Sequence, residues 1–152
     1  MKTFEFNSAI CTSRQQSKRL LALGIKKETA DMYYRFYDEN TYEINPTWET
    51  IWEDRNDYKE IIPAWSLHRL IEMIPKQVKT PKPTYGWVGE DLTFRMNDDL
   101  YIQYEDWGIE NEEYRFCGKG FYNSNLYDNI IECIEWLTKE GYFNKEYLEE
   151  KE

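Results

Sequence analysis

Histidine is nearly absent from this sequence, which contains only His68 among its 152 residues. A metal site built from several histidines is therefore excluded. A histidine-based catalytic triad would have to use His68, and the thiols that could pair with it, Cys11 and Cys117, lie far from it along the chain. Because a nucleophile and its base are defined by geometry, this pattern favours a structural or surface histidine over a catalytic one.

Cysteines and long apolar runs are also scarce. Three cysteines, an odd number, stand far apart at Cys11, Cys117 and Cys133, which suits reduced thiols better than a disulfide framework. Residues 1–7 have no apolar signal core, and no apolar run approaches the roughly 20 residues of a membrane span. We expect a cytoplasmic protein with no membrane association.

Basic residues are fewer than acidic residues. The sequence contains 19 Lys and Arg and 29 Asp and Glu, which gives a net charge of −10. Such a field repels phosphate backbones and favours basic partners. Residues 20–25 resemble the turn of a helix-turn-helix. However, Leu20 stands where that motif needs a small residue and Ala30 where it needs a β-branched one. We expect no direct nucleic-acid binding.

Motifs for metals and cofactors are missing as well. Several acids lie on or beside the predicted strands, but the nearest match to a metal-dependent nuclease pattern, Glu113-Tyr114-Arg115, lacks the required lysine. Residues 118–120 form a glycine-rich turn without the length or the Ser/Thr of a phosphate loop. The sequence predicts no metal and no cofactor.

Aromatic residues, by contrast, are abundant: 13 Tyr, 7 Phe and 6 Trp. Rings bury a large area and tolerate half-wet positions, so we expect them at the core and rim of a small sheet. An alternative is a stacking platform for a sugar or a base. The rings that could build it are Tyr85, Trp87, Tyr101, Tyr104 and Trp107.

A central stretch, residues 61–75, reads as a short amphipathic helix between two prolines. Ser66 is the predicted N-cap, Trp65 and Leu70 occupy the positions of a hydrophobic staple, and Pro75 ends the helix. The apolar face contains Leu67, Leu70, Ile71 and Ile74. Only His68 and Arg69 are left without a packing role, which makes them candidate binding residues.

The N-terminal part predicts a first helix that begins at a capping box and ends at Gly24. The box is formed either by Thr12 with Gln15 or by Ser13 with Gln16. A second short helix is expected over residues 28–32. A hairpin is expected over residues 33–44, broken by Asn45-Pro46, with irregular chain over residues 47–60.

The C-terminal part predicts a β-meander after a solvated connector of prolines and lysines at residues 76–83. Alternating residues in 92–96 and 100–104 require a three-residue loop, because only that register pairs Met96 with Leu100, Phe94 with Ile102 and Leu92 with Tyr104. Further strands are expected at 85–88 and 114–117. A helix over residues 126–140 closes at Gly141, and Asn144 is a candidate cap for a final turn.

Three stretches together resemble a group of small uncharacterised proteins from Bacteroides-type gut bacteria and their phages and mobile elements. They are residues 11–32, residues 62–75 and residues 127–137, including Cys11-Thr12-Ser13, Ile62-Pro63-Ala64-Trp65-Ser66-Leu67 and Tyr127-Asp128-Asn129. The resemblance implies an accessory protein inside the cell and no assigned activity.

We therefore predict a single α+β domain, with a helical half over residues 1–75, a connector over 76–83 and a meander plus helix over 84–152. The predicted function is non-enzymatic protein–protein interaction as an accessory protein of phage or mobile-element origin. One specific version is an acidic inhibitor that covers a basic surface. Two alternatives are a small-ligand module using Trp87, Tyr101 and Trp107 and a small enzyme using His68.

Overall fold

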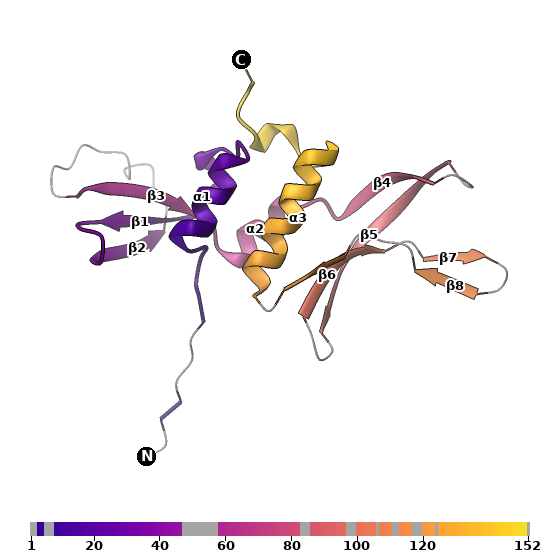
Figure 1. Cartoon of the computed structure of the whole chain (residues 1–152), viewed down its shortest axis with the longest axis horizontal. Coiled ribbons are helices and arrows are strands. Elements are labelled where there is room, and N and C mark those ends of the chain that lie inside the picture. Colours follow the sequence, from indigo (N-terminus) through magenta and orange to yellow (C-terminus); the bar gives the residue numbers. More distant parts are fainter. Residues whose placement is uncertain are drawn as a thin grey trace. The chain divides into compact units, whose positions relative to one another are not determined.

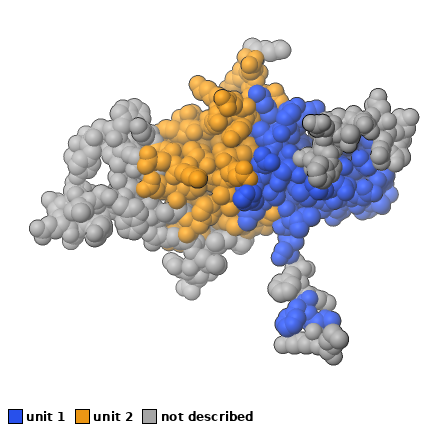
Figure 2. Space-filling view, turned by 180° about the vertical axis from the view of Figure 1, so that it is seen from behind, with its two compact units in different colours: residues 1–70 blue, residues 71–152 orange. Residues whose placement is uncertain are grey.

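The structure is a computed structural model that describes residues 3–4, 8–46, 58–82, 86–96, 100–105, 107–110, 113–116, 120–123 and 125–151. Its described helices and antiparallel sheets confirm the α+β class (Figure 1). The chain divides into two compact units, residues 1–70 and residues 71–152 (Figure 2). The single-domain organisation stays a prediction.

The first unit contains a three-stranded antiparallel sheet in the order β2-β1-β3. The predicted hairpin is confirmed as β1 (Met32–Phe36) and β2 (Tyr42–Pro46). Asp38 holds the turn, because its Oδ1 accepts hydrogen bonds from the backbone N–H groups of Asn40 and Thr41 at 2.8 and 2.7 Å. The predicted break at Asn45-Pro46 is wrong. Both residues belong to β2, where an edge position tolerates a proline.

Strand β3 (Glu60–Ala64) was not expected from the sequence, which assigned this segment to the approach of a helix. It pairs with β1, so that Tyr34 lies opposite Ile62. Pro63 is tolerated because β3 lies at the edge of the sheet, where its missing N–H removes no ladder bond. The half predicted to be helical therefore contains three strands.

Helix α1 (Arg14–Ala22) uses the second of the two predicted capping boxes. Ser13 Oγ accepts the N–H of Gln16 at 3.2 Å, and Gln16 Oε1 accepts the N–H of Ser13 at 2.8 Å. Gly24 has the left-handed φ of 87° expected after a helix end. The predicted second helix is reduced to one 3-10 turn, η1 (Lys27–Thr29), because Met32 already belongs to β1.

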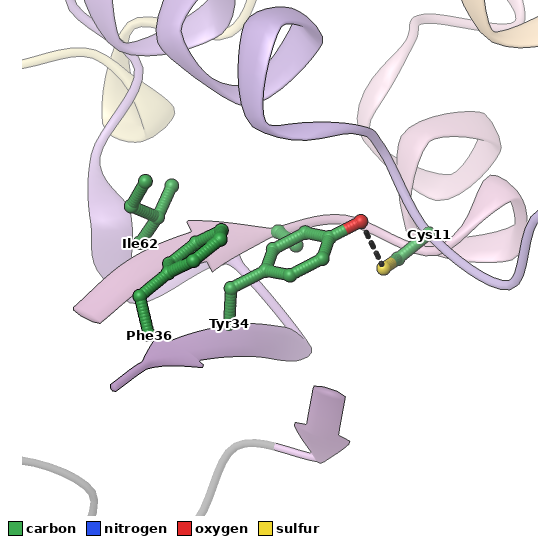
Figure 3. Close-up of a cluster of buried hydrophobic side chains, with 5 residues drawn as sticks. Cys11, Tyr34, Phe36 and Ile62 are labelled. Carbon is green, nitrogen blue, oxygen red and sulfur yellow. Dashed lines mark hydrogen bonds between the residues drawn. The ribbon is translucent and has the colours of Figure 1, made fainter. Parts of the chain in front are cut away.

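Thr12 joins the N-terminal segment to the end of β3. Its backbone N–H donates to the carbonyl oxygen of Trp65 at 2.8 Å, and its Oγ1 accepts the N–H of Trp65 at 3.1 Å. The hydroxyl of Tyr34 donates to the carbonyl of Thr12 at 2.9 Å. The same phenol accepts from Cys11 Sγ at 3.6 Å. Both residues belong to a buried cluster that also contains Phe36 and Ile62 (Figure 3).

Helix α2 (Leu67–Met73) begins where the sequence predicted. Ser66 Oγ accepts the N–H of Arg69 at 3.1 Å and donates to the carboxylate of Asp31. Trp65 and Leu70, the two residues of the predicted staple, are both fully buried. The cap therefore also joins α2 to the segment before β1.

The second unit contains a four-stranded antiparallel sheet in the order β4-β5-β6-β9 (Figure 1). The predicted register between β5 (Gly86–Met96) and β6 (Leu100–Glu105) is confirmed at all three predicted pairs. The loop at residues 97–99 lies outside the described residues. The predicted strand at 85–88 proves to be the first part of β5 from Gly86 onward.

The connector prediction is wrong for most of its length. Residues 77–82 form β4 (Gln77–Lys82), which pairs with β5, and Val78 is buried. Pro81 is accommodated because β4 lies at the edge of the sheet. The predicted strand at 114–117 is β8 (Glu113–Phe116), which forms a separate two-stranded sheet with β7 (Trp107–Glu110). Cys117 lies outside the described residues.

Helix α3 (Leu126–Glu140) packs on β6 and the short strand β9 (Gly120–Tyr122). Asn125 caps its first turn, and Gly141 closes it with a φ of 79°. Asn144 caps the final 3-10 turn, η3 (Lys145–Tyr147), as predicted. The apolar stripe of α3 packs inwards. Its fully buried members are Ile130, Ile131, Cys133, Ile134 and Leu137.

No helix among the described residues is long and apolar enough to cross a membrane.

Candidate functional site

The five candidate residues from the sequence do not share one unit. His68 is exposed and Arg69 is half-buried, both on α2 in the first unit. Tyr101 is half-buried on β6 in the second unit. Trp87 lies on β5 and Trp107 on β7, where only the backbone is described. Neither unit therefore assembles the five, and their binding roles stay a prediction.

Ser66, Cys11 and Cys133, three described residues with a nucleophilic oxygen or sulfur, have structural roles. Ser66, two residues before His68, is the cap of α2, and its hydroxyl is already bonded to Asp31. Burial raises the pKa of the Cys133 thiol to about 12 and also raises the pKa of the Cys11 thiol. At neutral pH both thiols are protonated, so neither is an activated nucleophile.

Metal ligands do not converge either, within the described part of the chain. No group of three or more His, Cys, Asp or Glu side chains there could hold an ion.

An open groove of about 480 Å³ lies in the second unit, between β9 and α3. From β9 it is lined by Gly120, Phe121 and Tyr122, and from α3 by Glu132, Glu135, Trp136 and Lys139. The α3 residues recur at i, i+3, i+4 and i+7, which places them on one flank of the helix. We call this hollow the β9–α3 groove.

Trp136 forms the apolar wall of the groove and is held by three neighbouring rings. The Trp136 ring centroid lies 6.0 Å from those of Tyr104 and Phe121 and 5.5 Å from that of Tyr142. Tyr104 is itself fixed, because its hydroxyl donates to the carbonyl of Pro75 at 2.7 Å. Burial raises the pKa of Tyr104, so this phenol remains a neutral donor. The contacts with these three rings therefore fix the indole of Trp136 in place at the groove before any partner binds.

The carboxylate of Glu132 is also oriented by the chain around it. Asn123 Nδ2 donates to Glu132 Oε1 at 3.4 Å. The carbonyl of Asn123 accepts from Asn129 Nδ2 at 3.2 Å, and Asn129 is fully buried. A buried amide therefore anchors the turn that orients Glu132 at the groove.

Tyr122 marks the opposite rim and has an exposed fraction of 64%. It lies opposite Tyr101 across β6 and β9, with ring centroids 5.2 Å apart and planes inclined by 36°. A Cβ on Gly120 would lie 2.8 Å from Cε2 of the Tyr122 ring. The glycine therefore lets this ring lie flat along its own strand, beside Tyr101.

Sequence reasoning found Tyr101 but missed the groove beside it. Strand β9 has three residues, too few for a periodic signal. The spacing of Glu132, Glu135, Trp136 and Lys139 was readable as a second flank of the last helix. Its significance depends on β9 lying alongside, which the sequence did not indicate.

A second hollow of about 320 Å³ lies between the end of α2 and η3. Its lining includes Glu72, Lys76, Tyr142, Asn144 and Tyr147. The side chain of Asn144 accepts the N–H of Glu146 at 3.0 Å, so one of its polar groups is committed to the cap. This hollow has neither an edge strand nor a large exposed ring.

Comparison with known proteins finds no matching family model, no matching curated protein and no matching solved structure.

Proposed function

We propose that this protein is a non-enzymatic binding protein whose β9–α3 groove receives a basic segment of a partner protein. The observation that carries the proposal is the composition of the groove. Its lining contains the carboxylates of Glu132 and Glu135, the ring of Trp136 and one basic residue, Lys139, so acidic groups outnumber basic ones. Carboxylates form strong charge-assisted hydrogen bonds with Lys and Arg, and aromatic faces attract the same cations.

The charge of the whole chain supports the same type of partner. A net charge of −10 attracts basic surfaces and slows the approach of acidic ones. A protein that covers a basic surface would also compete with the phosphate-bearing ligands of that surface. In this proposal the protein is an accessory factor of phage or mobile-element origin, acting inside the cell as an inhibitor of such a partner.

A second candidate is a small-ligand module, favoured by the exposed ring of Tyr122 beside Tyr101. The 36° inclination of these two rings makes them a poorer platform for a flat sugar or base than coplanar rings would be. The groove is also an open hollow and not an enclosed cavity, which suits a chain segment better than a compact ligand.

The test is selection from a random peptide library displayed on phage, panned on the native protein. We expect the selected peptides to be enriched in Lys and Arg relative to the library. Their binding should fall about ten-fold with Glu135→Lys, because charge reversal replaces an attraction by a repulsion. Glu140→Lys is the matched control, since it makes the same charge change on an exposed residue of α3 outside the groove.

Two results would contradict the proposal. One is a selection that yields no peptide above background. The other is a set of peptides that bind Glu135→Lys and the unmodified protein equally well.

A further inference from the structure

The outer edge of β9 borders the β9–α3 groove. Among the described strands, β9 is hydrogen-bonded only to β6 and ends the sheet. An edge strand carries unpaired N–H and C=O groups along its outer side. These groups are the template on which another extended chain can pair.

The lining of the groove indicates that it follows this edge. Successive side chains of a strand point to opposite faces of the sheet. Phe121 and Tyr122 are successive, and Phe121 is on the α3 side, where it contacts Trp136. The hollow is lined by Gly120 as well as by these two residues, so it runs beside all three residues of β9.

We infer that the partner segment binds as an added β-strand, paired antiparallel or parallel with the outer edge of β9. This inference rests on the proposed function, because it specifies how the same groove holds the basic segment. Main-chain hydrogen bonds to β9 supply part of the affinity, and alternate side chains supply specificity. A three-residue strand spans about 10 Å, so about three partner residues pair.

The side chains on the two faces of the added strand contact different kinds of residue. Side chains directed towards α3 meet two carboxylates, one ring and one ammonium, those of Glu132, Glu135, Trp136 and Lys139. The two carboxylates outnumber the ammonium, so this face selects Lys or Arg, whose methylene stems can pack on the ring of Trp136. Side chains directed away from α3 meet the Tyr101–Tyr122 pair, which selects apolar or aromatic residues. The occupant is therefore an extended segment in which basic and apolar residues alternate.

A second copy of this chain fits the edge less well. Pairing of β9 with its own counterpart would bring Glu132 and Glu135 of two copies towards one another, and like charges repel. The net charge of −10 adds to that repulsion. A basic partner segment is instead attracted by these carboxylates.

The experiment uses the tightest peptide from the library selection, resynthesised with an N-methyl group on one backbone nitrogen at a time. Each N-methyl group removes one hydrogen-bond donor. We expect losses of about ten-fold at alternate positions of the paired segment and little loss between them. Amide hydrogen exchange at residues 120–122 should slow when the unmodified peptide binds.

A charge swap tests the direction of the side chains. Replacing the basic residue assigned to the α3 side with Glu should abolish binding to the unmodified protein. The same peptide should recover binding to the Glu135→Lys variant but not to Glu140→Lys. Recovery on both variants would overturn the assignment of that face.

The failures of the two proposals are distinguishable. If the peptide binds but the N-methyl losses show no alternation, or exchange at residues 120–122 is unchanged, strand addition is wrong and the basic-segment function stands. If no peptide binds, both are wrong. If the protein alone dimerises in sedimentation with slowed exchange at residues 120–122, the edge is occupied by a second copy and the inference is overturned.

Discussion

Thr12 shows how one buried hydroxyl can join distant parts of the chain. Its Oγ1 lies 2.8 Å from Ser17 Oγ and accepts the backbone N–H of Trp65, and the residue is fully buried. In the sequence Thr12 looked like a helix cap, because its spacing to Gln15 fits a capping box. Ser13 took that role, which left Thr12 free to hold the end of β3.

Replacing Thr12 with Val should lower the free energy of unfolding by about 1–3 kcal/mol. The reason is that the N–H of Trp65 and the hydroxyl of Ser17 both lose a buried partner. Urea denaturation followed by tryptophan fluorescence measures the change.

Thr138→Val is the matched control. Thr138 Oγ1 is buried and has no hydrogen-bond partner among the described residues. The same replacement there should cost less than about 0.5 kcal/mol, because Thr and Val have similar helix propensities. Equal losses at both positions would show that the hydrogen bonds of Thr12 do not stabilise the fold.

At the scale of single elements, helix α3 serves both the core and the groove. One face buries its aliphatic stripe, and the adjacent flank presents Glu132, Glu135 and Trp136. The helix ends are defined locally, by the side chain of Asn125 and by the left-handed Gly141. A well-capped helix therefore carries the wall of the candidate site.

Gly141→Ala and Gly120→Ala should behave differently. A Cβ at Gly141 meets no atom within 4 Å, so its cost is the strain of φ 79° alone. We expect a loss of about 1–2 kcal/mol in unfolding free energy. A Cβ at Gly120 meets the end of the exposed Tyr122 ring instead, which can swing away.

Gly120→Ala should therefore change stability little but weaken binding of the selected peptide, because the ring leaves its place beside Tyr101. Denaturation and peptide titration of both variants separate the two effects. A Gly120→Ala protein that binds normally would remove Tyr122 from the proposed site.

At the scale of the whole molecule, the −10 charge acts on any partner before contact is made. Long-range attraction raises the association rate and is screened by salt over about 10 Å at 0.1 M ionic strength. Short-range contacts in the groove govern the dissociation rate instead.

Raising the salt concentration should therefore slow association of the basic peptide much more than it changes dissociation. The double variant Glu149→Lys/Glu150→Lys, at exposed positions outside the groove, should lower the association rate at low salt and leave dissociation unchanged. Stopped-flow or surface-plasmon kinetics measure both constants. A salt-independent association rate would contradict steering by the net charge.

Local signals were predicted well because their physics lies within a few residues. The caps at Ser66 and Asn144, the left-handed Gly24 and Gly141, and the register of β5 with β6 depend on neighbouring backbone groups or on strict alternation. The elements that were missed, β3, β4, β7 and β9, are short strands. Two of them contain a proline, which the sequence pattern alone marks as irregular chain.

The sequence by itself determined the α+β class, the cap of α2 at Ser66, the glycine that ends α3, the register of β5 with β6 and the net charge of −10. Only the tertiary structure decided that β9 lies alongside α3, and hence that Tyr122 and Gly120 meet Glu132, Glu135 and Trp136 in one groove. The physical reason is that hydrogen-bonding alternation and capping are local. By contrast, the free edge of a three-residue strand exists only when a sheet forms around it and a helix packs beside it.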